Sequence, residues 1–376
     1  MTPPNGAPAI STLFLRDTHH GGPSDQPTEV AGALADFVAA ASASVDVAIY
    51  DFRLSDPKAA SIVVDTLVQA AQRGVTVRVA YDAGKPPAQT TTAFAAVGGD
   101  PAPVGTQEWV MQHFSGTPVQ TKAIKAAPQL MHSKYVVRDG PRNAQAAGHG
   151  ATPAVWTGST NFTDAAWTRQ ENNIIILPGA DLAAGYQADF DQLWTTGSIK
   201  KTGAGDAGDT TVGGATVGWA FSPGDGPVID AGLVHRIQGA RERLIVAAMV
   251  LTSHDVLAAL ADAIDRGVPV TGIYDGGQMN PIVRQWQDDP HDAEVLGAWT
   301  AVSAELARKE SAPYSPTGPH DFMHLKVLVS DGTVSTGSYN FSANAERNAE
   351  NQVHLDDPTT VAAYVDFLAA VTQAYS

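Results

Sequence analysis

Apolar residues recur at helical spacing in some segments of the chain and in short β-branched runs in others. Residues 33–52 predict a helix that runs into a strand, and residues 62–84 predict a helix, a stop at Gly74 and a second strand. The same order returns at 234–251 and 255–277, again with a glycine after the second helix. Helices that alternate with short strands predict an α/β fold.

The chain therefore contains an internal repeat, which predicts two similar halves. Each half continues through a long stretch without a regular pattern, 85–130 and 278–322, and then reaches another strand. The residues between the halves are rich in Gly and Thr, which is typical of a linker. We expect a first half over 1–200, a linker over 201–218 and a second half over 219–376.

Composition and charge narrow the class of protein. With 44% hydrophobic and 16% charged residues, the 376-residue chain has an ordinary globular composition, which excludes a disordered, collagen-like or coiled-coil protein. The absence of cysteine excludes disulfides, thiolate metal sites and a cysteine nucleophile. The longest apolar run, 244–251, is far shorter than the ~18–20 residues of a membrane-spanning helix. The net charge of −16 argues against a protein that binds long nucleic acid by neutralising phosphates.

One strand in each half carries the candidate chemistry, MHSKYVVRDG (131–140) and MHLKVLVSDG (323–332). The His and Lys of each strand are two residues apart, so both side chains point to one face. An imidazole beside a fixed cation makes a site for an anion, with the histidine available as nucleophile or general acid. The pairs are His132 with Lys134 and His324 with Lys326.

The residues that follow each strand supply hydrogen-bonding groups. Gly-Ser-x-Asn-Phe occurs once in each half, and on extended backbone its Ser and Asn can hold phosphoryl oxygens: Ser159, Asn161, Ser338 and Asn340. A glutamate ten residues after each Asn is suited to accepting a proton from one imidazole nitrogen and thereby fixing the tautomer: Glu171 and Glu350. Ordinary turn hydrogen bonding for Ser and Asn, and a surface ion pair for each Glu, are the alternatives.

The doubled pattern H-x-K-x4-D followed by G-S-x-N-F resembles the phospholipase D superfamily of phosphodiesterases, over roughly residues 30–370. The resemblance implies two similar phospholipase D-like α/β halves, each a mixed β-sheet flanked by helices, with the active site at their interface. It also implies a covalent phosphohistidine intermediate formed without a metal. No metal-ligand spacing, phosphate loop or dinucleotide fingerprint occurs in the sequence, so we expect no cofactor.

Carried over by position, the resemblance also implies a role for each residue. His132 would attack phosphorus, and His324 would protonate the leaving oxygen and then activate water or an alcohol. The phosphate would be bound by Lys134, Lys326, Ser159, Ser338, Asn161 and Asn340. Glu171 and Glu350 would orient the histidines, and Asp139 and Asp331 would be structural.

The two halves differ in one local way. His132 and Ser159 are 27 positions apart, whereas His324 and Ser338 are 14 apart. The additional residues within 140–155 predict a lengthened loop that leaves the motif intact and affects access to it.

The substrate class stays open between alternatives. The stretches before the catalytic strands are rich in aromatic and apolar residues and poor in basic ones, which favours a phospholipase D that releases phospholipid head groups, with transfer to alcohols as a second outcome. These residues are Phe94, Trp109, Met111, Phe114, Trp286, Trp299, Tyr314 and Phe322. Packing beneath long loops is the competing explanation. The alternative function is a metal-independent endonuclease of the same superfamily. Two further alternatives rank below these. They are a cardiolipin or phosphatidylserine synthase-like transferase and a non-catalytic binding protein.

Partners and compartment are expected from the same observations. We expect a phospholipid or another phosphodiester as substrate, with nucleic acid as the alternative, and transient contact with a membrane surface. Because both motifs stand in one chain, we expect a monomer. The N-terminal residues lack the basic start and apolar stretch of a secretory signal, so a cytoplasmic location is the default, and secretion stays open if a signal has been removed.

Overall fold

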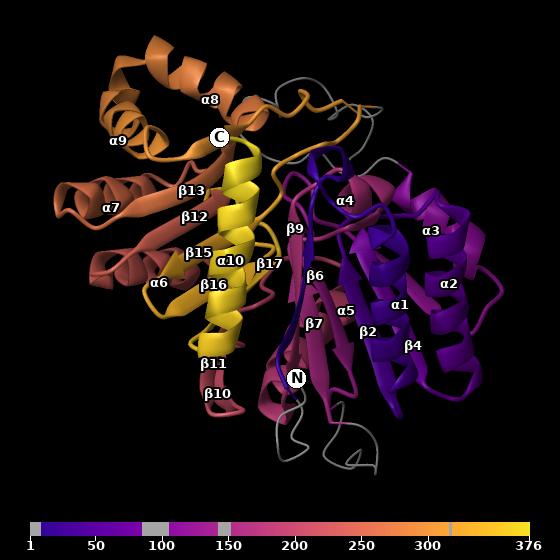
Figure 1. Cartoon of the computed structure of the whole chain (residues 1–376). Coiled ribbons are helices and arrows are strands. Elements are labelled where there is room, and N and C mark those ends of the chain that lie inside the picture. The colour runs from indigo at the N-terminus through magenta and orange to yellow at the C-terminus, as the bar shows by residue number, and fades with distance from the viewer. Residues whose placement is uncertain (1–8, 85–104, 142–151, 316–317) are drawn as a thin grey trace.

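The computed structural model describes residues 9–84, 105–141, 152–315 and 318–376. It contains two large mixed β-sheets, one from each half of the chain, and helices flank both of them (Figure 1). The fold class expected from the repeat is therefore confirmed.

The first sheet has the strand order β1-β9-β7-β6-β2-β4-β5. Strands β2, β4 and β5 are parallel, and the other neighbours are antiparallel. The strands are β1 (Ser11–Leu15), β2 (Ser44–Ile49), β4 (Thr76–Asp82), β5 (Gln120–Ile124), β6 (Lys134–Arg138), β7 (Ala154–Gly158) and β9 (Asn172–Pro178). A separate small sheet pairs β3 (Phe52–Arg53) with β8 (Phe162–Thr163). The helices of this half are α1 (Gln26–Ala39), α2 (Pro57–Gln72), α3 (Thr106–Phe114), α4 (Asp164–Thr168) and α5 (Ala180–Thr196).

The second sheet has the order β10-β11-β17-β16-β15-β12-β13-β14, again with a parallel part, β12, β13 and β14. The strands are β10 (Gly208–Val212), β11 (Ala215–Ser222), β12 (Leu244–Ala248), β13 (Val270–Asp275), β14 (Ala307–Lys309), β15 (Lys326–Ser330), β16 (Thr333–Gly337) and β17 (Glu350–Leu355). The helices are α6 (Gly226–Gly239), α7 (His254–Asp265), α8 (Gly276–Asp288), α9 (Ala293–Ser303) and α10 (Pro358–Ala374). Within the described residues there are also two short 3-10 turns, Thr18–His20 and Pro290–Asp292.

Local sequence signals set the ends of the repeated helices. The Asp56 side chain accepts a hydrogen bond from Ala59 N at 2.7 Å at the start of α2, and Ser253 caps α7 in the same manner. Gly74 and Gly267 follow the ends of these helices with φ of 93° and 79°, which glycine adopts without strain. The predicted glycine stop is therefore confirmed in both halves.

Helices α5 and α10 join the two sheets. Figure 1 shows α10 between the two halves of the molecule. One hydrophobic core contains Tyr186 and Phe190 of α5, Tyr364 and Leu368 of α10, and buried residues of both sheets. Because this core is shared, the end of each sheet that carries the His-Lys motif is held at the interface between the halves.

Two expectations from the sequence need correction. Residues 201–218 are more than a linker, since β10 and β11 form a hairpin at the edge of the second sheet. The stretches 85–130 and 278–322, where no regular pattern was expected, contain regular elements: α3 and β5 in the first, and most of α8 with α9 and β14 in the second. Helix α8 shows why the pattern was missed. Its buried apolar residues Met279, Ile282 and Trp286 recur every three to four positions, but polar neighbours and the internal Pro281 obscure the spacing.

Among the described residues, every helix is too short or too polar to serve as a membrane span.

Candidate active site

The His-Lys segments enter the site at the start of β6 and β15. In the first half, Met131 N donates to Asp82 Oδ2 at 2.7 Å, and Lys134 Nζ donates to the carbonyl oxygen of His132 at 2.8 Å. The second half repeats both contacts, with Met323 N to Asp275 Oδ2 at 2.7 Å and Lys326 Nζ to the His324 carbonyl at 2.7 Å. All four His and Lys side chains are almost fully buried. The expected strand geometry thus places each ammonium beside its own histidine.

His132 is held by a residue of the opposite half. Its Nδ1 atom lies 2.7 Å from Oε2 of Glu350, and the other oxygen of that carboxylate accepts from Asn348 Nδ2 at 3.1 Å. The Tyr50 ring packs edge-on against the imidazole, with ring centroids 4.9 Å apart. A buried carboxylate at Nδ1 fixes the orientation of the ring, and Glu350 is one of the two glutamates that the sequence suggested for this contact.

The arrangement around His324 differs from the one expected. Its Nδ1 atom lies 2.9 Å from Oδ1 of Asn172, the residue after Glu171. The Glu171 carboxylate accepts hydrogen bonds from Lys309 Nζ at 2.7 Å and from the Tyr375 hydroxyl at 2.6 Å. The glutamate ten residues after Asn161 is therefore not the group that faces His324 Nδ1. The residue after it, Asn172, is.

The Gly-Ser pair of each motif forms a tight crossing with the next strand. Gly158 and Gly337 have φ of 143° and 149°, and a Cβ atom on either would lie about 2 Å from a backbone oxygen of that strand. Ser159 and Ser338 are fully buried, and their hydroxyls accept from backbone N–H groups at 3.1 and 2.9 Å. These contacts give the serine hydroxyls a structural task between neighbouring strands, and they are not the local turn hydrogen bonds that were the alternative.

The motif asparagines are placed differently from the serines. Asn161 and Asn340 are 7% and 8% exposed, and the Oδ1 atom of each is buried without a hydrogen-bond partner. A buried polar atom without a partner costs free energy unless a ligand completes the site. The same orphan atom at both equivalent positions marks the asparagines as candidates for ligand contact.

A pocket brings residues of both halves together. Asn161 lines it with Tyr50 from the first half and with His324 and Phe322 from the second; the remaining lining residues are Asp51, Arg53, Thr163, Gln170, Tyr314 and His320. The Arg53 guanidinium donates to Asp51 at 2.7 and 2.6 Å, and these bonds raise the pKa of Arg53 above its ordinary value. The wall of the pocket that His324 also lines therefore carries an Arg53–Asp51 ion pair.

Asp139 and Asp331 hold the other end of the strands. Asp139 accepts three backbone N–H groups, including Ala43 N at 2.6 Å and Ser44 N at 2.9 Å. Asp331 accepts from the backbone of residues 241–243 at 2.9 to 3.0 Å. Both have positive φ, 53° and 49°, which Asp tolerates better than most residues. These contacts tie the strand exit to the turn before the neighbouring strand.

The aromatic residues expected at the rim divide into two groups. Tyr314 and Phe322 line the pocket, with the His320 ring stacked between them at centroid distances of 5.1 and 5.6 Å. Phe114, Trp286 and Trp299 are buried in hydrophobic cores, Trp109 is partly buried against one, and Met111 is 54% exposed. Phe94 and residues 142–151 of the lengthened loop lie outside the described residues.

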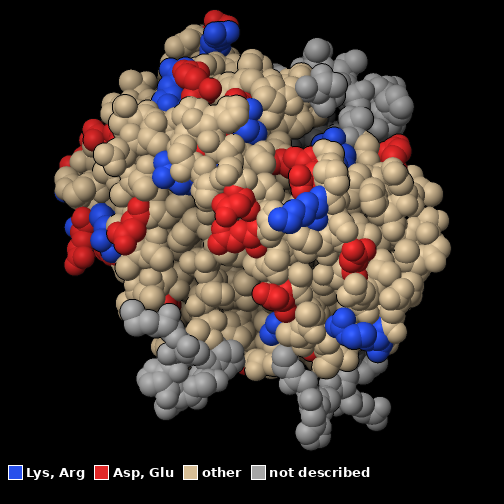
Figure 2. All heavy atoms as spheres, turned by 45° about the vertical axis from the view of Figure 1, so that its right-hand side comes forward, with Lys and Arg blue, Asp and Glu red and all other residues tan. Residues whose placement is uncertain are grey.

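The charged side chains on one face of the molecule are mixed in sign. On the face shown in Figure 2, Lys and Arg side chains stand in small groups among acidic ones and form no continuous basic band in the described residues. This distribution agrees with the net charge of −16, and the face shown supplies no extended track for a polyanion.

Two motifs meeting at one interface define a site for phosphodiester chemistry, and the family comparison agrees. The model of the cardiolipin synthase, phospholipase D-like domain matches residues 34–194 and 233–371, most of the chain. The chain belongs to this family and thus to the phospholipase D superfamily. No curated protein sequence matches it.

Two solved structures share this fold over nearly the whole chain. Phosphatidylserine synthase of Haemophilus influenzae is 12% identical, with a TM-score of 0.61 over 96% of this chain and 86% of its own. Polyphosphate kinase of Porphyromonas gingivalis is 13% identical, with a TM-score of 0.55 over 96% of this chain but only 46% of its own. Nuc of Salmonella typhimurium, a phospholipase D family member, is 22% identical over 43% of this chain and 95% of its own, with a TM-score of 0.32.

Three residues of the site were not singled out from the sequence. Asn172 follows the predicted Glu171 directly, and the E-N-N run was the only signal for it. Tyr50 and Lys309 come from other strand ends and carry no motif. Their proximity depends on the strand order of each sheet.

Proposed function

We propose that the protein is a phosphodiesterase that works through a covalent phosphohistidine, and that its substrates are phospholipids from which it releases the head group to leave phosphatidic acid. The supporting observation is that motif residues of the two halves meet at their interface and that one motif residue from each half lines the same pocket. His132 is held by Glu350 of the other half, and the pocket joins Asn161 to His324.

In the first step His132 Nε2 attacks phosphorus while the bond to the leaving oxygen breaks. His324 donates its proton to that oxygen, so the head-group alcohol leaves neutral. Negative charge grows on the phosphoryl oxygens as phosphorus becomes five-coordinate. Lys134 and Lys326 are fixed cations beside the two histidines, and such preorganised charge lowers the barrier without reorganisation. The Asn161 and Asn340 amides complete the phosphate site.

In the second step the intermediate is released by the reverse order of events. His324, now neutral, takes a proton from water, and the water oxygen attacks phosphorus while the bond to His132 Nε2 breaks. An alcohol in place of water gives a transferred phosphatidyl group. Division through a covalent intermediate replaces one difficult displacement by two easier ones.

The pocket favours a lipid over a polynucleotide. The rings of Tyr50, Tyr314 and Phe322 line it, and the face in Figure 2 lacks a continuous basic band among the described residues. A protein that binds nucleic acid without such a band would gain little from counterion release. An endonuclease of the same superfamily is the alternative, and a synthase-like transferase follows because the matching family model is that of cardiolipin synthase.

A competition assay tests the proposal. Purified protein is incubated with mixed phospholipid vesicles and single-stranded DNA together, and products are identified by mass spectrometry with His132→Ala as control. Phosphatidic acid with intact DNA is the expected result, and it also identifies the released head group. Cut DNA with intact lipid would replace the lipase by the endonuclease. If neither is cleaved, turnover of bis(p-nitrophenyl) phosphate separates a phosphodiesterase with a small soluble substrate from failure of the proposed chemistry.

A further inference from the structure

Each half places a residue opposite the histidine of the other half, and the two residues differ. The reason is that the Gly-Ser motif pairs with the next strand one position later along the chain in the first half than in the second. In the second half, Ser338 N donates to the Asn351 carbonyl at 2.9 Å, and the residue before Asn351 is Glu350. In the first half, Ser159 N donates to the Asn173 carbonyl at 3.0 Å, and the residue before Asn173 is Asn172. Asn172 is therefore the structural counterpart of Glu350. By its spacing from the motif Asn, Glu171 had been expected to be the counterpart of Glu350.

Backbone contacts across the interface show the same shift. His132 N donates to the Ala349 carbonyl at 2.8 Å, whereas His324 N donates to the Glu171 carbonyl at 3.1 Å. Glu171 thus occupies the position that Ala349 has in the second half. Each of the two directly precedes the residue that faces a histidine Nδ1, Asn172 for His324 and Glu350 for His132. The extra residue of the first half lies between Asn161 and Asn172, the stretch that contains the short helix α4.

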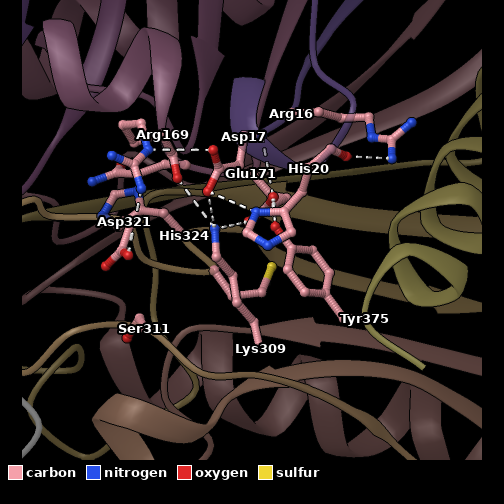
Figure 3. Close-up of polar contacts among 12 residues, drawn as sticks. Arg16, Asp17, His20, Arg169, Glu171, Lys309, Ser311, Asp321, His324 and Tyr375 are labelled. Atoms are coloured by element: carbon pink, nitrogen blue, oxygen red, sulfur yellow. Dashed lines mark hydrogen bonds and ion pairs between the residues drawn. The ribbon is translucent and has the colours of Figure 1, made fainter.

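The Glu171 side chain is engaged elsewhere. Figure 3 shows Lys309, Tyr375 and Asp17 gathered around it. Its carboxylate accepts from Lys309 Nζ at 2.7 Å, from the Tyr375 hydroxyl at 2.6 Å and from Asp17 N at 3.2 Å. Glu171 and Lys309 are only 1% and 2% exposed. This buried pair joins β14 and the C-terminal residues to the first half.

The orientation of the Asn172 amide is fixed by its own partners. Its Nδ2 group donates to the Ala166 carbonyl and to Gln170 Oε1, both at 3.1 Å. Its Oδ1 atom accepts from Ser159 Oγ at 2.7 Å and faces His324 Nδ1. An amide oxygen can only accept, so the proton between the two side chains lies on Nδ1 and the lone pair of neutral His324 lies on Nε2.

We propose that Asn172, and not Glu171, is the positioning residue of His324, so that the two histidines of the site have partners of unlike charge. The inference rests on the proposed phosphodiesterase. The Glu350 carboxylate stabilises the cationic ring that forms when His132 Nε2 bonds to phosphorus. The neutral Asn172 amide orients His324 equally well but does not stabilise its imidazolium in this way. His324 therefore gives up its proton to the leaving oxygen more readily.

The first test changes the charge at position 172 and at position 171 in two separate variants. Asn172→Asp places a carboxylate at Nδ1 and should move the alkaline limb of the kcat–pH profile upward by about one to three pH units. Glu171→Gln should leave that limb in place. Both variants leave the other charged and titratable groups around His324 unchanged: Asp17, Asp51, Arg53, Arg169, Lys309, His320, Asp321 and Lys326. A limb that moves with Glu171→Gln and not with Asn172→Asp would overturn the proposal.

Folding is controlled separately because both positions are buried. Circular dichroism and thermal unfolding are recorded for each variant. If Glu171→Gln does not fold because Lys309 loses a partner, the double variant Glu171→Gln/Lys309→Met removes both charges and takes its place. If Asn172→Asp does not fold, Asn172→Ser retains a neutral acceptor. Asn172→Ser should then lower kcat, leave the alkaline limb of the kcat–pH profile in place and change KM little. An unchanged kcat would contradict the proposal.

The second test measures the division of roles with a leaving group that needs no proton. With bis(p-nitrophenyl) phosphate, His324→Ala should release about one p-nitrophenolate per enzyme and then stop, with the phosphoryl group mapped to His132 by mass spectrometry. His132→Ala should give no burst. A burst in His132→Ala instead would reverse the roles and overturn the inference. If the wild-type protein releases no p-nitrophenolate, the proposed function itself has failed.

Discussion

His132 Nδ1 lies 2.7 Å from Glu350 Oε2, although the two residues are 218 positions apart and come from different halves, His132 just before β6 and Glu350 at the start of β17. The contact is buried, with both side chains at most 1% exposed. It makes each half dependent on the other, because the half that carries the first histidine lacks the carboxylate that holds it. In the proposed mechanism, function and interface packing are therefore coupled.

Loss of either histidine should abolish turnover while the fold is retained. His132→Ala and His324→Ala remove the nucleophile and the proton donor, so kcat for a phospholipid substrate should fall roughly 10⁴-fold or more. Steady-state assays and circular dichroism check this. The exposed His291→Ala variant is the matched control and should keep full activity. Near-normal turnover by either site variant would contradict the mechanism.

Glu350→Gln should separate orientation from charge. The amide can still accept from Nδ1, but it no longer stabilises the cationic ring, so kcat should fall by about two to four orders of magnitude with a small change in KM. The matched control is Glu294→Gln, an exposed position on α9. Equal activity of Glu350→Gln and wild type would show that the buried carboxylate has no catalytic consequence.

Chelation should leave the activity unchanged. In the proposed mechanism the positive charge at the phosphate comes from Lys134 and Lys326, so EDTA should not alter the rate. Assays with and without EDTA, followed by readdition of Mg²⁺, Ca²⁺ or Zn²⁺, measure the effect. Inactivation by EDTA and recovery with one of these ions would assign the electrostatic role to a metal instead.

The glycine of the second motif should not tolerate a side chain. A Cβ at Gly337 would lie 2.2 Å from the Asn351 carbonyl oxygen, at a φ of 149°. Gly337→Ala should therefore lower the free energy of unfolding by about 3 kcal/mol. Gly297→Ala is the control, because a Cβ there meets open space within helix α9. Urea unfolding of both variants decides whether the crossing is as tight as described.

Asp189 should make stability depend on pH. Burial raises the pKa of this carboxyl to about 7, and Tyr135 donates to it at 2.6 Å. The folded state therefore binds a proton that the unfolded state releases near pH 4. This contribution to stability is fully present below pH 4 and is lost as the pH rises through 7. In urea unfolding from pH 4 to pH 8, the stability advantage of wild type over Asp189→Asn should shrink by up to a few kcal/mol. A constant difference would show that Asp189 titrates normally.

Much of the fold could be predicted because its signals are local. The helix-glycine-strand order, the left-handed Gly74 and Gly267, and the His-Lys alternation each involve residues within a few positions of one another. Helix α8 was missed because its apolar positions are interrupted by polar residues and Pro281. The hairpin of β10 and β11 was missed because Gly and Thr are as common in linkers as in a two-residue turn with positive φ at Gly213 and Gly214.

The sequence by itself determined the repeat, the α/β class and the identity of the paired His and Lys residues, because alternation along a strand fixes which side chains share a face. Tertiary structure alone decided what stands behind each histidine. One extra residue before Asn172 shifts a strand by one position, and this turns Glu171 toward Lys309 and brings Asn172 to His324. No local pattern reports such a shift, because register is set by pairing with a distant strand and by the core that α5 and α10 share between the sheets.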